Sequence, residues 1–495
     1  MTSLAFYGGI NEIGGNKFLL EDKGTKVFLD FGMQMGKANQ YFAEFTQPRG
    51  LNGMGDLFEL GLLPKLHGLY RRDYSKHMEF DGDHNNDTDF DGVLLTHAHV
   101  DHCAYIHYLR PEIPIYCTEE SKLIMQTFQD TGGNEQYIDY KENFKFYENK
   151  KGGMSRATKE DHREERKRTL KIIEPYKKFK IDSIEVEPVP VDHSLPGVCG
   201  FIIHTSNGTI GYTADLRFHG RRKEESEKFI ERCADSNLDH LLCEGTRLAK
   251  DKSKTEYQVE DDVKNAVNAT SGLVVVTYPV RDLDRLESFY LAAKETGRHL
   301  VIDHKQAYLL NLFDNSEKTK GKYPGLDDPV IKIFNRRKSW GMLGRTTNED
   351  MLLSDYKIWE RDFIGTDNSL THSDVSANSK DYMLFCSDFS LTDLIDVRPP
   401  EGSSYIRSST EPFDDEMAID QERVKRWLVH FGLLKKDENW TVTHVSGHGS
   451  RDQIQRVVEG SNAKALIPIH TEDDEYFDRW HKNVHRVELD KTIQI

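Results

Sequence analysis

The segment from Val93 to His102 reads VLLTHAHVDH and concentrates side chains that can bind metal ions. His97 and His99 lie two residues apart, so on an extended backbone they point to the same side and can share one ion. Asp101 and His102 follow one turn later and suit a second ion. Imidazoles and a carboxylate at this spacing favour zinc-type coordination with room for water. A solvated polar loop is the alternative, but the HxHxDH spacing directly after a strand speaks against it.

We expect β-strands to position these ligands. Several other apolar runs of the chain also end in a residue that can bind a metal ion. The run before His97 is typical of a buried strand, which places the ligands at a sheet edge where a cleft can open. A lone histidine at a strand end is usually structural, whereas repeated endings of this kind beside HxHxDH favour metal ligation. Further runs of this type end in His193 (IEVEPVPVDH), Asp215 (TIGYTAD), Glu244 (HLLCE) and His470 (KALIPIH).

Asp30 ends another such run, VFLD, two residues before Gly32. A carboxylate in this position can orient a metal-binding histidine by accepting a hydrogen bond from its second ring nitrogen. An aspartate in a simple turn would have the same sequence context, so both interpretations stay open here.

Composition sets limits on the class of protein. The chain has 495 residues, enough for two or three domains, with 37% apolar and 30% charged residues. A net charge of −17 argues against a protein that coats nucleic acid, although a local basic groove remains compatible with it. Six scattered cysteines without a CxxC pair fit a reducing cytosol. The apolar runs are too short to span a bilayer and the start has no signal-peptide pattern, so we expect a cytoplasmic protein without a membrane segment.

The organisation changes along the chain. Up to Glu244 strands dominate, and beyond it GLVVVTYP, RDLDRLESFYLAAKETG and HLVID alternate as strand, helix and strand, which predicts a parallel sheet. The basic segment 141–180 contains REERKRTLKIIEPYKKFK, for which we expect helix. Its mixed charges are most often a salt-bridged surface, with RNA contact as the alternative. The acidic run in 80–92 lacks the closing glutamate of a calcium loop and is interpreted as a solvated loop.

These motifs, taken with SGHGS and PIH near the end, make the chain resemble the metallo-β-lactamase superfamily, and within it the β-CASP nucleases of ribonuclease J type. The resemblance extends over FYGGINEIGGNKFLLE, the middle segment around RDLDRLESFYLAAKETGRHLVID, RSSTEPFDDE and the tail. It implies an α/β fold, an αββα sandwich interrupted by a β-CASP domain with a mainly parallel sheet. The expected parts are residues 1–250 for the first part of the sandwich, 251–437 for the β-CASP domain and 438–495 for the return segment.

The resemblance also assigns the ligands. One zinc ion would be held by His97, His99, His193 and Asp215. A second would be held by Asp101, His102, Asp215 and His470, so that Asp215 bridges the two. Manganese is an alternative to zinc, because mixed nitrogen and oxygen sites exclude neither. His470 favours an RNA-processing enzyme, since the DNA-processing branch usually has valine there.

The implied chemistry is hydrolysis of RNA to 5′-phosphate and 3′-hydroxyl products, with 5′-to-3′ exonuclease action favoured and endonuclease action open. Two metals would activate water and hold both reacting oxygens. His448, held by Glu244, is the candidate acid for the leaving 3′-oxygen. We expect the loop Ser446, Gly447, His448, Gly449 and Ser450 to bind phosphate, and Asp101, Asp215, His448 and Glu244 to be catalytic.

Other functions are known alternatives for a metal core of this kind. A small-molecule hydrolase such as a lactonase or thioesterase can use the same metal core, but the β-CASP-like segment counts against it. A DNA nuclease is a further alternative, and intact ligands speak against a silent scaffold subunit. The expected partner is single-stranded RNA, and a homodimer is an open arrangement.

Overall fold

The first sheet of the computed structural model forms from the alternating N-terminal segments and the strand that precedes the histidine motif. Its strand order is β10-β5-β4-β3-β2-β1-β24. The bounds are Thr2–Phe6 (β1), Phe18–Asp22 (β2), Thr25–Leu29 (β3), Gly92–Leu94 (β4), Ile115–Cys117 (β5), Leu170–Ile172 (β10) and Thr492–Gln494 (β24). The structure describes residues 1–495 except 44, 76–87, 134, 143–144, 158–163, 251–253, 339–352, 411, 413–414 and 436–439.

A second sheet packs against the first and shares its core. Its order is β11-β12-β13-β14-β15-β23. The bounds are Phe179–Ile181 (β11), Ile184–Pro190 (β12), Cys199–His204 (β13), Thr209–Tyr212 (β14), His240–Glu244 (β15) and Ala465–Ile469 (β23). Leu4, Phe6 and Phe18 from one sheet and Val186 and Phe201 from the other lie in a single buried cluster. The two sheets are therefore the inner layers of a sandwich.

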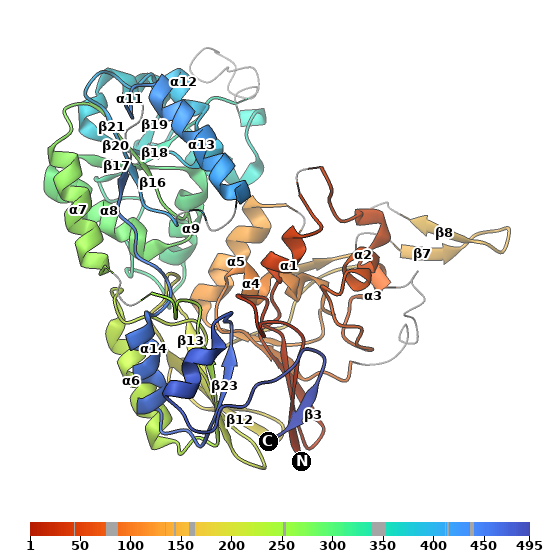
Figure 1. Cartoon of the computed structure of the whole chain (residues 1–495). Helices are drawn as coiled ribbons and strands as arrows, with labels where there is room; N and C mark the ends of the chain where they lie inside the picture. The colour runs from red at the N-terminus through yellow and green to blue at the C-terminus, as the bar shows by residue number, and fades with distance from the viewer. Residues whose placement is uncertain are drawn as a thin grey trace.

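Helices cover the outer faces. The helices of this sandwich are Met35–Asn39 (α1), Gly55–Glu59 (α2), Arg72–Ser75 (α3), Val100–Cys103 (α4), Glu119–Thr131 (α5), Lys223–Asp235 (α6) and Arg451–Gly460 (α14). Helices α6 and α14 lie side by side on the second sheet, and α5 lies on the side of the first (Figure 1). The predicted αββα arrangement is confirmed.

A third sheet forms the predicted parallel domain. Its order is β19-β18-β17-β20-β16-β21-β22 and all its strand pairs are parallel. The bounds are Val274–Thr277 (β16), His299–Ile302 (β17), Ile331–Phe334 (β18), Ser369–Leu370 (β19), Tyr382–Phe385 (β20), Ser404–Arg407 (β21) and Thr441–Val442 (β22). Because β22 still pairs with β21, the chain leaves this sheet only after Val442.

The helices of this domain are Glu256–Asn268 (α7), Leu283–Thr296 (α8), His304–Asn315 (α9), His372–Ala377 (α11), Asp393–Val397 (α12) and Asp415–His430 (α13). The central strands β16 and β20 are buried on both faces, as their continuous apolar sequences require. This domain stands above the sandwich, with α9 beside α5 at the junction (Figure 1). None of the described helices is long and apolar enough to cross a membrane.

The prediction of a helix in the basic segment 141–180 is wrong. Residues 165–181 instead contain Glu165–Lys167 (β9), β10 and β11. Leu170 and Ile172 are partly buried while Lys171 between them is exposed, which is the two-residue period of a strand. Pairing of β10 with β5 at the sheet edge overrides the local helical propensity.

Strands β6 (Asp139–Lys141) and β9 pair antiparallel, and β7 (Lys145–Glu148) and β8 (Met154–Ala157) form a hairpin that extends from the sandwich (Figure 1). RNA contact in this segment stays a prediction. Residues 80–87 of the expected acidic loop lie outside the described residues.

Candidate metal centre

The ligand-bearing segments of both sheets meet at one edge of the sandwich. His97 and His99 follow β4, and α4 then carries Asp101 and His102. From the second sheet come His193 after β12, Asp215 after β14 and His470 after β23. The edge combines residues far apart in sequence because strands of a sandwich end side by side.

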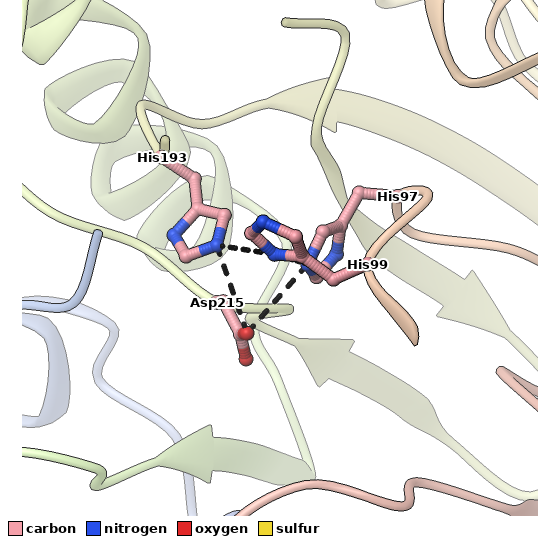
Figure 2. Close-up of side chains that lie close together, drawn as sticks. All are labelled: His97, His99, His193 and Asp215. Atoms are coloured by element: carbon pink, nitrogen blue, oxygen red, sulfur yellow. Dashed lines mark hydrogen bonds and ion pairs between the residues drawn. The ribbon is translucent and has the colours of Figure 1, made fainter. Parts of the chain in front are cut away.

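The first cluster contains His97, His99, His193 and Asp215 (Figure 2). The Nδ1 atom of His99 lies 3.0 Å from Nε2 of His97 and 3.0 Å from Nε2 of His193. Asp215 Oδ2 lies 3.6 Å from His97 Nε2 and 3.8 Å from His193 Nε2. Three imidazole nitrogens and one carboxylate oxygen thus converge on one point.

The second cluster contains Asp101, His102, Asp215 and His470. His102 Nε2 lies 3.1 Å from Asp215 Oδ2, and His470 Nε2 lies 3.2 Å from Asp101 Oδ2. Asp215 is common to both clusters, as the resemblance implied. The structure therefore brings together all the predicted ligands in the predicted grouping.

The outer nitrogens of the ligand histidines have partners that fix the rings. His102 Nδ1 donates to Asp30 Oδ2 at 2.7 Å, and His193 Nδ1 donates to the Gly447 carbonyl at 2.5 Å. In the same way, Nδ1 of His97 lies 3.0 Å from the Thr96 hydroxyl, and Nδ1 of His470 lies 2.8 Å from the Thr246 hydroxyl. These bonds leave Nε2 of each ring free to bind a metal.

Asp30 is a buried hub of hydrogen bonds and not a turn residue on the surface. Besides His102, its carboxylate accepts from the Thr96 backbone at 2.8 Å and from the Tyr212 hydroxyl at 2.6 Å. From the sequence, Asp30 is one candidate to orient a metal-binding histidine. Its hydrogen bond with His102 Nδ1 has the geometry that this role requires.

The donor set fits metal ions. Asp215 Oδ1 is buried and has no hydrogen-bond partner among the described residues, which is costly unless something else occupies its lone pairs. The ligand atoms of each cluster lie within 4.8 Å of one another. Zinc is bound by histidine nitrogens and carboxylate oxygens in this way, with bonds of about 2.0–2.2 Å. The residues present therefore suit divalent cations.

Backbone strain also marks this edge. Asp30, Ala214 and His470 have φ values of 57°, 55° and 51°, in the left-handed region that residues with a side chain rarely adopt. All three lie at strand ends that carry or support ligands. Such strain persists where surrounding contacts enforce it, often at functional sites.

The imidazoles of the first cluster are held neutral. Burial, followed by the neighbouring histidines, lowers the pKa of His97 and His193 well below the usual value. Burial lowers the pKa of His99 to about 4. Neutral imidazoles have a free lone pair, which is the form that binds a metal.

The second cluster has the opposite electrostatics. Burial alone would lower the pKa of His102, but the carboxylates of Asp215, Asp101 and Asp30 raise it well above its usual value. These three carboxylates thus attract positive charge to this position.

His448 lies beside both clusters. Its ring centroid is 5.0 Å from that of His193 and 5.6 Å from that of His470, and its Nδ1 atom is 3.3 Å from Glu244 Oε1. Burial alone would lower its pKa, but Glu244 and Asp215 raise the pKa of His448 to about 9. Glu244, His448 and His470 also lie close enough together to form a third group of potential ligands.

The loop that carries His448 is fixed from both domains. Arg217 Nη1 donates to the Ser446 carbonyl at 3.2 Å and His219 Nε2 to the same oxygen at 2.9 Å. Arg285 of α8 donates to the Val445 carbonyl at 3.2 Å. Glycine is required at position 447, because an added Cβ would lie 2.7 Å from His193 Cε1. These supports place His448 next to the clusters.

The backbone of this loop is already hydrogen-bonded. The amides of His448, Gly449 and Ser450 donate to Ser446 Oγ, the Leu216 carbonyl and Gln453 Oε1 at 3.1, 2.7 and 3.1 Å. This leaves side chains, not these amides, as the groups available to contact a phosphate.

Sequence reasoning missed several supporting residues: Thr96, Tyr212, Arg217, Thr246 and Arg285. Thr96 and Arg217 are close in sequence to predicted ligands, which is the only signal they offered. Arg285 lies on a helix of the other domain and gave none.

Comparison with known proteins places this geometry in a family. Residues 77–276 match the model of the Beta-lactamase superfamily domain, and residues 438–481 match that of the Zn-dependent metallo-hydrolase RNA specificity domain. The first match contains six of the predicted ligands and the second contains His470 together with His448.

Curated relatives and a solved structure agree with these matches. Ribonuclease J of Sinorhizobium meliloti is 20% identical over 77% of this chain and 57% of its own length. Ribonuclease J of Mycobacterium tuberculosis is 24% identical over 59% of this chain and 43% of its own length, so the chain spans about half of these relatives. A crystal structure of a protein of unknown function from Enterococcus faecalis has the same fold, with a TM-score of 0.71 at 22% identity over 99% of both chains.

The ligand grouping, the domain matches and the shared fold together lead to one assignment. The chain contains a β-lactamase superfamily domain, and its pairing of this hydrolase domain with an RNA-specificity segment is consistent with the β-CASP, ribonuclease J-like family.

Proposed function

We propose that this protein is a zinc-dependent ribonuclease that hydrolyses phosphodiester bonds to 5′-phosphate and 3′-hydroxyl products. The observation that carries the proposal is the pair of ligand clusters joined by Asp215, with His448 beside them. Paired metal sites of this kind serve in-line displacement at phosphorus.

The two metals would be held by the clusters already described. When bound, such ions act as Lewis acids and lower the pKa of water, which supplies the nucleophile at neutral pH. Asp30, Thr96, Thr246 and the Gly447 carbonyl keep the ligand rings oriented.

His448 is the proposed proton donor. Its imidazolium would protonate the leaving 3′-oxygen, which is a poor leaving group as an alkoxide, and general acids of this kind contribute about 10²–10⁴-fold. Glu244 holds the Nδ1 side of the ring, so that Nε2 is the atom that faces substrate. Glu244 is fully buried and therefore acts through His448 as a positioning residue.

RNA as the substrate is supported by two findings. The segment that matches the RNA specificity domain contains both His448 and His470, and relatives that match the chain are named ribonuclease J. Single-stranded RNA is the form we infer, with 5′-to-3′ exonuclease action favoured over endonuclease action. Six buried free cysteines fit the reducing cytoplasm as its location.

Digestion of a defined RNA tests this function. The metal-loaded protein is given the same RNA with a 5′-triphosphate, a 5′-monophosphate or a 5′-hydroxyl, and product lengths and ends are read. We expect mononucleotides with 5′-phosphates, and no products after chelation. Equal cleavage of DNA, or hydrolysis of a thioester but not of RNA, would contradict the proposal.

A further inference from the structure

A cavity of about 180 Å³ lies at the carboxyl ends of β17 and β18 in the third sheet. Its lining includes Lys305, which follows β17, and Arg336 and Lys338, which follow β18. Ligands of open parallel sheets bind at the carboxyl ends of the strands. The cavity is smaller than the ~300–1,000 Å³ of sites for drug-sized ligands, so it suits a small group.

The charge in the cavity is positive. Lys357 joins the three residues above, which makes four cationic side chains, against the carboxylates of Asp303 and Glu360. Glu360 pairs with Lys338 at 2.6 Å, and Arg336 pairs with Asp393 at 3.0 Å. Within the described part of the chain, no carboxylate lies at ion-pair distance from Lys305 or Lys357.

The nearby cations act on Lys305. Burial lowers the pKa of its ammonium group, and although Asp303 opposes this, Arg281, Lys357 and Arg336 lower it further. An anion in the cavity would relieve this repulsion.

Trp359 adds a donor without a partner. It lines the cavity, and its Nε1 atom is buried with no hydrogen-bond acceptor among the described residues. Its ring packs against that of Tyr308 in an edge-to-face arrangement, with 5.6 Å between the ring centroids. Because an indole nitrogen only donates, the partner that this N–H lacks among the described residues is an acceptor such as the oxygen of an anion.

The cavity lies on the same junction as the metal centre. Thr131 of α5, from the sandwich, is part of its lining. One turn earlier on α5, Phe128 stacks under Arg281, which lies 3.5 Å from the ring centroid. The positive charge of Arg281 also lowers the pKa of Lys305 in the cavity.

We propose that this cavity binds a phosphate group of the RNA strand, away from the scissile bond. This rests on the proposed function, since the strand is the substrate that would run along the junction from the metal centre. Lys305, Lys357 and the Trp359 indole would contact the phosphate oxygens, and Arg336 and Lys338 would add positive charge.

The test compares two matched double variants. K305E/K357E reverses both unpaired charges in the cavity. K320E/K380E makes the same change at exposed lysines of the same domain, outside the cavity. Metal content and melting temperature of both must match the wild-type protein, which shows that the fold and the clusters are intact.

Binding is measured on the metal-loaded proteins with a phosphorothioate-linked RNA of about 20 nucleotides, longer than the ~4–16 nucleotides that one single-strand binding fold covers. We expect K305E/K357E to weaken binding by about tenfold or more at moderate salt, and to reduce the slope of log affinity against log salt by about 0.7 per lost contact. K320E/K380E should change affinity less than twofold. Equal losses in the two variants, or an unchanged slope, would overturn the proposal.

Trp359→Phe sharpens the test, because it removes the N–H together with the five-membered ring, keeps an aromatic side chain and changes no charge. We expect about threefold to tenfold weaker RNA binding with an unchanged salt slope, since no charge is lost. Binding of adenosine monophosphate that is lost in K305E/K357E, with unchanged affinity for the strand, would assign the cavity to a free nucleotide and overturn its assignment to RNA. Failure of the proposed function is separate, because it shows as wild-type protein that binds RNA without cleaving it.

Discussion

The two ligand clusters of the metal centre differ in their chemistry although they share Asp215. The first contains three imidazoles, and the second contains two imidazoles and the further carboxylate of Asp101. Nitrogen-rich sets suit zinc, whereas oxygen-rich sets also accept manganese or magnesium. The first cluster should therefore bind its metal more selectively, and the second should exchange its metal more readily.

The clusters also differ in how the protein supports them. In the second, the side chains of Asp30 and Thr246 orient His102 and His470. In the first, His193 is oriented by the backbone carbonyl of Gly447, which a substitution cannot remove, and His97 by the Thr96 hydroxyl, which also lies 3.4 Å from Nδ1 of His102 in the second cluster. The second cluster is thus the one that single substitutions can weaken selectively.

The largest effect should come from Asp215→Ala. Its carboxylate belongs to both clusters, so its loss leaves two cations repelling each other, and we expect both metals to be lost or weakened. RNA hydrolysis should fall by about 10⁴-fold or more, as when an essential catalytic residue is removed. Elemental analysis and RNA turnover check this. A mild loss equal to that of Asp101→Ala would contradict the bridging role.

His448→Ala removes the proposed acid and leaves all cluster ligands. Both metals and RNA binding should remain, while hydrolysis falls by about 10²–10⁴-fold. The loss should shrink on a 3′-phosphorothiolate substrate, because a thiolate departs without a proton. If His448 is instead a metal ligand, metal content falls and the leaving group does not matter. An equal loss on both substrates would favour phosphate positioning.

Asp101→Ala separates the clusters. Only the second contains this carboxylate, so we expect about one metal per chain to remain, bound at the first cluster. Hydrolysis should fall by more than the ~10–100-fold typical of changes around the ligands. Metal stoichiometry after dialysis is the measurement, and loss of both metals would show that the clusters are not independent in this way.

Thr246→Val should have the smallest effect. It removes the hydroxyl that lies 2.8 Å from His470 Nδ1 and leaves every ligand in place. Affinity for the second metal should fall by about 10–100-fold, measured by chelator competition, while the first metal is unaffected. Thr296→Val is a matched control, because that hydroxyl bonds only within its own helix. Equal weakening of both metals would contradict the selective support.

The metal clusters could be predicted from the sequence because each ligand ends an apolar strand. His97, His193 and His470 follow strands whose burial is evident from their composition, and the resemblance supplied their grouping. The alternation after Glu244 likewise predicted the parallel sheet.

The remaining features depend on tertiary contacts that local sequence does not report. The strands in 165–181 form because β10 pairs with β5, against their helical propensity. Thr246 and Arg285 matter only because folding brings them to His470 and the Val445 carbonyl. The hydrogen bonds of the backbone amides around His448 could not be predicted from the sequence either, because acceptors such as the Leu216 carbonyl come from distant segments.

The central claim is that two metal ions joined by Asp215 carry out RNA hydrolysis, and a metal titration tests it most directly. Metal-free protein is reconstituted with increasing zinc, and cleavage of a single-stranded RNA is followed against bound metal per chain. We predict that turnover rises to a plateau at two bound ions and that every product carries a 5′-phosphate and a 3′-hydroxyl. Full activity with one bound ion, or intact RNA with two, would contradict the account.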